Sequence, residues 1–250
     1  MLFEIIASCF CLLVMVIFVP QFLKAAWPEK TNKSLLLKML CATLFVAIAV
    51  LQMRIADNFG AFATRMMWGF VLSWFGDLFL HVRLKPKELW YALGVAAFFG
   101  GHMFFISGYT LAGDKLLGLS FWSAPEMFAV AALLTTAVVL IFKKVKVHGN
   151  RFLPLLLIYA VAVITMMVKA VGLSVRLFAD GQQPWYAMLL LGAGGICFAL
   201  SDFLLLLFDF GRKRKDKPNR FHSYKIKSVY IWAYFIAQVL LGLTILYIKA

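Results

Sequence analysis

Two aspartates inside long apolar stretches are the residues best suited to chemistry. Asp202 lies within residues 192–210 (GAGGICFALSDFLLLLFDF), and Asp77 has a similar setting in residues 75–80 (FGDLFL). Each follows a small residue and precedes a run of apolar residues. A carboxylate at the centre of a membrane helix costs roughly 3 kcal/mol, so it needs a partner, a proton or a function. These two aspartates are therefore the main functional candidates.

The protonation states of two buried aspartates suggest the kind of reaction. Burial disfavours the charged form of a carboxyl, and two nearby carboxyls resist double ionisation. We expect one aspartate to hold a proton near neutral pH while the other stays charged, which suits acid–base hydrolysis. The structural alternative is that an aspartate only pairs with a basic residue such as Lys38.

The composition indicates the class of protein to which the chain belongs. Of its 250 residues, 64% are hydrophobic and 14% charged, and the mean hydropathy is +0.90. A soluble domain has about a quarter of its residues charged. The sequence therefore predicts an all-α, multi-pass membrane protein.

Eight apolar windows, each about 20 residues long, predict eight transmembrane helices. They cover residues 3–22, 35–53, 61–82, 89–110, 122–142, 152–177, 184–210 and 228–248. The short connections predict a single transmembrane domain over residues 1–250. The similar settings of Asp77 and Asp202 suggest two parallel four-helix halves, although apolar spans can also resemble one another by chance.

The basic residues predict the orientation in the membrane. The net charge is +14, and 19 of the 25 Lys and Arg residues lie in connections one, three, five and seven. By the positive-inside rule, these connections face the cytoplasm and both termini face outward. The sequence shows no eukaryotic retention signal, which favours a bacterial cytoplasmic membrane and leaves the endoplasmic reticulum as the alternative. In either membrane the basic loops attract anionic lipid headgroups. The charge pattern does not favour nucleic-acid binding, and it leaves the oligomeric state open.

Other polar residues are expected at the depth of the aspartates. With a rise of about 1.5 Å per residue, Asp77 and Asp202 lie roughly 8–12 Å below the cytoplasmic boundary. Tyr159 falls in the same layer, and Lys38 lies just above it. His102 has no second His or Cys at ligand spacing, so neither a metal nor another cofactor is expected. It can be a pocket residue or a packing residue.

The order of these residues along the chain resembles the YhhN/TMEM86 family of lysoplasmalogenases. The matching residues span nearly the whole chain: Lys38, Gly76, Asp77, Leu80, His102, Tyr109, Tyr159, Met166 or Met167, Gly192, Ala193, Phe198, Ser201, Asp202, Tyr234 and Gln238. One position differs. The family often has a tyrosine three residues after its histidine, and this chain has Phe105 there.

The resemblance implies an ether-bond hydrolase. Its reaction would cleave the vinyl-ether bond of a lysoplasmalogen into a fatty aldehyde and glycerophosphoethanolamine or glycerophosphocholine. Such hydrolysis protonates an alkene carbon and passes through an oxocarbenium ion, as glycoside cleavage does. The resemblance implies Asp77 and Asp202 as catalytic residues. It implies substrate binding by Lys38, His102, Tyr109, Tyr159, Ser201, Tyr234 and Gln238, with the headgroup phosphate near Lys38 or neighbouring basic residues.

A proton-coupled transporter of lipids or small molecules is the main alternative function. Buried carboxylates and a parallel repeat would both suit proton coupling. Against it, few prolines interrupt the spans, and both aspartates are predicted on one side of the midplane. A non-catalytic lipid-binding membrane protein is a third interpretation.

Overall fold

The computed structural model describes residues 1–118, 120, 125–145, 153–181, 183–210 and 221–250. Within these ranges it contains α-helices and no β-strand, which confirms the all-helical prediction. The eight helices are α1 (Leu2–Ala25), α2 (Asn32–Ala56), α3 (Ala61–His81), α4 (Lys87–Leu117), α5 (Pro125–Val145), α6 (Leu153–Asp180), α7 (Trp185–Phe210) and α8 (Tyr224–Leu243). A single 3-10 turn, Thr244–Leu246, follows α8.

Six of these helices are long and apolar enough to cross a membrane, namely α1, α2, α4, α6, α7 and α8. The chain is therefore a multi-pass membrane protein. The other two, α3 and α5, run beside them: α3 packs against α2 and α4, and α5 packs against α6. That all eight helices cross the membrane stays a prediction.

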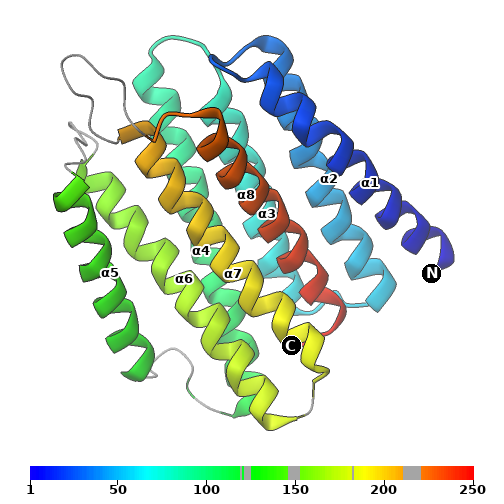
Figure 1. The fold of residues 1–250 in the computed structure, drawn as a ribbon. Helices are drawn as coiled ribbons and strands as arrows, with labels where there is room; N and C mark the ends of the chain where they lie inside the picture. The colour runs from blue at the N-terminus through cyan, green and yellow to red at the C-terminus, as the bar shows by residue number, and fades with distance from the viewer. Residues whose placement is uncertain (119, 121–124, 146–152, 182, 211–220) are drawn as a thin grey trace.

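Successive helices alternate in direction, so the connections of the chain are sorted between two ends of the bundle. The last residues of α1, α3, α5 and α7 lie at the same end as the first residues of α2, α4, α6 and α8 (Figure 1). This end, which we call the basic end, carries Lys24, Lys30, Lys33, Lys85 and Lys87. It is the end predicted to face the cytoplasm, and that orientation stays a prediction.

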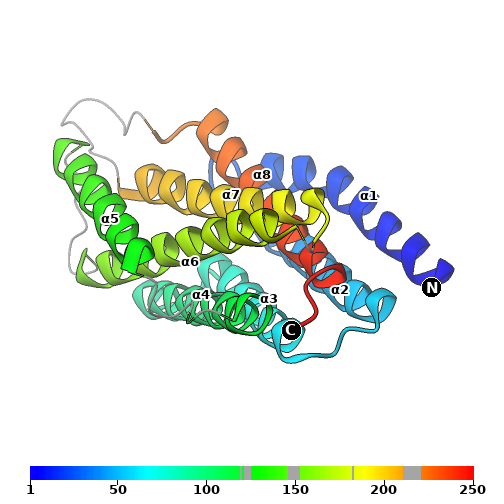
Figure 2. The same ribbon diagram turned by 90° about the horizontal axis from the view of Figure 1, so that it is seen from below.

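The bundle is elongated, with α1 at one edge and α5 at the opposite edge (Figure 2). Between them, α3 packs against α4, and α7 packs against α8. The two pairs are joined by α2, which packs against α8, and by α6, which packs against α4. Two four-helix halves would give this pattern of neighbours. The internal repeat itself stays a prediction.

Two glycines of α3 let α4 approach closely, as small residues do in membrane bundles. The Phe105 ring of α4 lies on Gly69, and the Phe98 ring lies on Gly76. A Cβ atom at Gly76 would overlap the Phe98 ring. Because Asp77 follows Gly76 in the chain, this contact fixes where the first aspartate enters the bundle.

The start of α2 is fixed by a capping box at the basic end. The Thr31 side chain accepts a hydrogen bond from the Ser34 amide at 3.0 Å, and the Ser34 hydroxyl accepts one from the Thr31 amide at 2.8 Å. The Ser34 hydroxyl also lies 2.7 Å from Nε2 of His81. Lys38 follows one turn later on the same face of α2. The cap therefore sets the register of this lysine.

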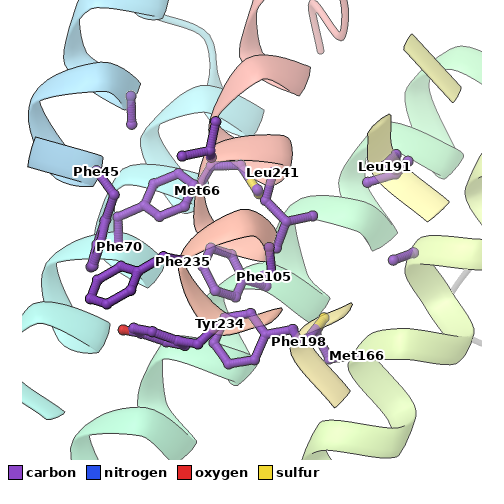
Figure 3. Close-up of a cluster of buried hydrophobic side chains, with 14 of the residues drawn as sticks. Phe45, Met66, Phe70, Phe105, Met166, Leu191, Phe198, Tyr234, Phe235 and Leu241 are labelled. Carbon is purple, nitrogen blue, oxygen red and sulfur yellow. The ribbon is translucent and has the colours of Figure 1, made fainter. Parts of the chain in front are cut away.

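Aromatic rings form the core of the bundle near the aspartates. Figure 3 shows Phe45, Phe70, Phe105, Phe198 and Tyr234 converging from α2, α3, α4, α7 and α8. The Tyr234 ring packs edge-on against Phe45 at 6.1 Å and against Phe198 at 5.6 Å between ring centroids. Such edge-to-face contacts favour one orientation of each ring. The core thus holds the Tyr234 ring in a fixed position.

Candidate active site

Both aspartates line one cavity of about 130 Å³. Of the residues predicted to form the site, this cavity is lined by Lys38, Asp77, Tyr159, Ser201, Asp202 and Tyr234. The lining continues to Lys30 and Lys227 at the basic end. Residues that are far apart in the sequence therefore meet around a shared space.

Asp77 is held by a lysine and a tyrosine. The Lys38 Nζ atom lies 2.9 Å from Oδ1 of Asp77, and the Tyr234 hydroxyl donates a hydrogen bond to Oδ2 at 2.8 Å. Asp77 is only 1% exposed. A buried charge needs such pairing and hydrogen bonding to be tolerated. Both carboxylate oxygens of Asp77 are therefore engaged, and its charge is balanced by an ammonium group.

Asp202 is held by a tyrosine and a histidine. The Tyr159 hydroxyl donates to Oδ2 of Asp202 at 2.6 Å. Nε2 of His102 lies 3.3 Å from the same oxygen and 3.1 Å from the Tyr159 hydroxyl. The hydrogen bonds of Asp202 within the described residues all use Oδ2. Its Oδ1 atom is therefore the oxygen left for a ligand.

Each aspartate is bonded by side chains from two other helices. Asp77 on α3 receives its bonds from α2 and α8, and Asp202 on α7 receives its bonds from α6 and α4. Phe198 connects the two groups, since its ring lies 4.8 Å from the His102 ring and 5.6 Å from the Tyr234 ring. Six helices thus position one constellation.

Asp202 also reaches a second space, which is almost entirely apolar. This space, the apolar groove, has a volume of about 250 Å³ and lies between α5, α6 and α7. Its apolar lining consists of Leu134, Val138, Ala160, Val163, Ile164, Met167, Ile196, Ala199, Leu200, Phe203 and Leu206. Tyr159, Asp202 and Leu206 line both the groove and the cavity. Asp202 therefore stands where a cavity that contains several charged residues meets an almost entirely apolar groove.

Three predicted binding residues do not line the cavity. His102 contacts Oδ2 of Asp202 but lines neither the cavity nor the apolar groove. Tyr109 follows His102 by about two turns of α4, and its buried hydroxyl has no hydrogen-bond partner within the described residues. Gln238 follows Tyr234 by one turn of α8 and is fully buried. Phe105 packs against Gly69 and Phe198, so this position contributes to the core.

Sequence reasoning missed several ionisable residues of the cavity lining: Lys30, His81, Asp209 and Lys227. His81, the last residue of α3, is 3% exposed and bonded to Ser34. Asp209 follows Asp202 by seven residues, a spacing that places both on one helix face, and this spacing was the available signal. The loss of water contact lowers the pKa of Lys30, while the Asp209 carboxylate opposes that shift.

The side chains at the site offer proton transfer. Within the described parts of the chain, no three His, Cys, Asp or Glu side chains come together as a set of metal ligands. A carboxyl, an imidazole and a phenol in mutual contact can hold and pass a proton. Asp77 lines the same cavity, and its pairing with the Lys38 ammonium makes it suited to supply a fixed negative charge.

The fold and the site define a helical multi-pass membrane protein with two buried aspartates on one cavity. The family model of the YhhN family matches residues 33–245. The chain therefore belongs to the YhhN family, which confirms the resemblance found in the sequence. The match includes both aspartates and their bonded partners, and it begins within α2, so that α1 lies outside it. No curated protein and no solved structure matches the chain.

Proposed function

We propose that this protein is a lysoplasmalogenase-like hydrolase that cleaves the vinyl-ether bond of single-chain ether phospholipids. The observation that carries the proposal is the position of Asp202. Asp202 lines both the cavity, which contains several charged residues, and the apolar groove. A lysoplasmalogen has its vinyl-ether bond at the equivalent junction, between a polar headgroup and a hydrocarbon chain. Membership of the YhhN family is consistent with this activity.

In the proposed mechanism, Asp202 supplies the proton. Its Oδ1 atom gives a proton to the alkene carbon that is not bonded to oxygen. The other alkene carbon and the ether oxygen then share the positive charge of an oxocarbenium ion. Tyr159 and His102 hold Oδ2 and stabilise the carboxylate that remains, because hydrogen bonds to an ionised acceptor are strong. The acid is the aspartate whose oxygen is not already engaged.

Asp77 is proposed to provide the fixed negative charge. The Lys38 ammonium favours the ionised form of Asp77, and a carboxylate near a developing cation stabilises it electrostatically. A water molecule attacks the oxocarbenium carbon and returns a proton to Asp202. The resulting hemiacetal then breaks its carbon–oxygen bond, which yields the aldehyde and the free glycerol hydroxyl. The proton delivered by Asp202 is restored in each cycle.

The two spaces suggest how the lipid lies. The hydrocarbon chain is proposed to occupy the apolar groove, where Leu134, Val163 and Leu200 contribute to the walls. The headgroup then extends through the cavity toward the basic end, in the leaflet that the positive-inside rule assigns to the cytoplasm. We infer a bacterial cytoplasmic membrane as the setting. The basic loops would there contact anionic headgroups of the surrounding lipid.

Aldehyde release by the detergent-purified protein tests the proposal. The wild type should release fatty aldehyde from a lysoplasmalogen. Asp202→Asn should lower kcat by about 100- to 10,000-fold, the usual contribution of a general acid, while lipid binding is retained. Asp57→Asn is the matched control, because Asp57 is an exposed residue that ends α2 in a left-handed conformation suited to asparagine. No aldehyde from well-folded wild type would contradict the proposal.

The same lipid in sealed vesicles separates hydrolysis from transport. A hydrolase should yield aldehyde without a net movement of intact lipid between compartments. A proton-coupled transporter would instead move the intact lipid in response to a pH gradient and yield no product. Flux of unreacted lipid through wild type, abolished by Asp202→Asn, would replace hydrolysis with transport.

A further inference from the structure

Two lysines and one aspartate lie at the opening of the cavity and take no part in the proposed reaction. Lys30 lies just before α2, Asp209 lies in the last turn of α7, and Lys227 lies in the first turn of α8. All three therefore belong to the basic end. Together with the rings of Tyr91 and Tyr230, they form what we call the mouth of the cavity.

The two lysines are anchored through part of their hydrogen-bonding capacity. Nζ of Lys30 donates to the Leu80 carbonyl at 2.8 Å, and Nζ of Lys227 donates to the Ala26 carbonyl. Neither forms an ion pair with a described residue. An ammonium group has three donors, so each lysine keeps donors for an anion. Two fixed ammonium groups at one opening suit a phosphate.

Asp209 places a negative charge within the same opening. Asp209 is an exposed residue and makes no ion pair within the described residues. It nevertheless lies close enough to Lys30 and Lys227 to interact with both electrostatically. A carboxylate beside two lysines would weaken the binding of a purely anionic ligand. It would favour a ligand that carries a positive group next to its phosphate.

Aromatic rings complete the mouth. Phe208 packs against Tyr230 at 5.5 Å between ring centroids, and Tyr91 packs against Phe210 at 5.9 Å. Ring faces attract organic cations such as alkylammonium groups. The mouth thus combines donors for a phosphate with a carboxylate suited to an amine, within an aromatic lining.

We propose that the mouth is a subsite for a zwitterionic headgroup, in which Lys30 and Lys227 bind the phosphate and Asp209 binds the cationic amine. This inference rests on the proposed function and adds to it the residues that recognise the headgroup. Of the two phosphate contacts that the resemblance implied, Lys38 or neighbouring basic residues, it selects the neighbouring residues, because Lys38 is held by Asp77. Asp209 becomes the residue that determines headgroup specificity.

Binding of saturated alkyl analogues tests the subsite independently of catalysis, since these lipids lack the bond that is cleaved. Affinities are measured on detergent-purified protein for two analogues with the same chain, one with a phosphocholine and one with a phosphoglycerol headgroup. Wild type should prefer phosphocholine. Asp209→Asn should weaken phosphocholine binding about tenfold, the effect of losing roughly 1.4 kcal/mol, and should bring the two affinities level. Lys30→Gln should weaken both lipids.

Controls make each result decisive. Asp209→Glu should restore the preference, and Asp57→Asn should leave both affinities at their wild-type values. An unchanged ratio in Asp209→Asn, or an equal loss for both lipids, would overturn the assignment of Asp209. Soluble glycerophosphocholine should bind far more weakly than the lipid, and equal binding would show that the occupant is not a lipid headgroup. Because none of these ligands is hydrolysed, absence of aldehyde release would leave this test intact.

Discussion

Asp77 and Asp202 have similar local sequence patterns, a small residue before and apolar residues after, but different surroundings. Asp77 has both oxygens engaged, one by an ammonium group. Asp202 has one oxygen engaged by a phenol and an imidazole, and it lines two spaces. The sequence could identify both residues, because a carboxylate in an apolar span is costly. It could not assign their roles, because the partners come from four other helices.

The Lys38–Asp77 pair should be essential to stability as a pair. Lys38→Met leaves the Asp77 carboxylate buried without its cation, and the free energy of unfolding should fall by about 3–5 kcal/mol. The double variant Lys38→Met/Asp77→Asn removes both charges and should be more stable than Lys38→Met alone. Thermal unfolding in detergent ranks the stabilities of the wild type, the single variant and the double variant. Equal stability of the single and the double variant would contradict the pairing.

At the scale of helices, much of the fold could be predicted from the sequence. Each predicted span overlaps one observed helix, because apolar windows of membrane length leave few alternatives to a helix. The ends differ more: α4 continues to Leu117, seven residues beyond the predicted end. Contacts between helices were not predictable. The packing of the Phe98 ring on Gly76, for example, depends on which helices become neighbours.

The apolar groove gives a prediction that belongs to α5, α6 and α7. Ala199 lines the groove on α7, and Ala199→Phe would fill part of it. This variant should lower kcat/KM for a long-chain lysoplasmalogen by about tenfold, within the range for a changed apolar pocket, and should affect a short-chain analogue less. Ala129→Phe, on the exposed face of α5, is the matched control. Equal losses for both chain lengths would contradict chain binding in the groove.

At the scale of the whole molecule, the site exists because the two ends of the chain meet. Lys38 of α2 and Tyr234 of α8 are nearly 200 residues apart in the sequence, yet both bind Asp77. The sequence predicted a common depth for several polar residues, and most of these do line one cavity. It missed the mouth, because Lys30, Asp209 and Lys227 lie at span ends, where charged residues are expected to be solvated.

The orientation of the molecule can be tested by labelling single cysteines. In a variant whose native Cys9, Cys11, Cys41 and Cys197 are replaced by alanine, Asp57→Cys should react with a membrane-impermeant maleimide in intact cells. Lys85→Cys, at the basic end, should react only after the membrane is opened. The reason is that loops rich in Lys and Arg stay in the cytoplasm. The reverse labelling pattern would place the basic end outside.

The central claim is that the protein protonates an alkene carbon through Asp202. Its most direct test is lysoplasmalogen hydrolysis in deuterated water, with the aldehyde reduced as it forms and analysed by mass spectrometry. The wild type should give a product with one deuterium on the carbon next to the former carbonyl, and Asp202→Asn should give almost no product. A wild-type product without that deuterium, or equal product from Asp202→Asn, would contradict the account.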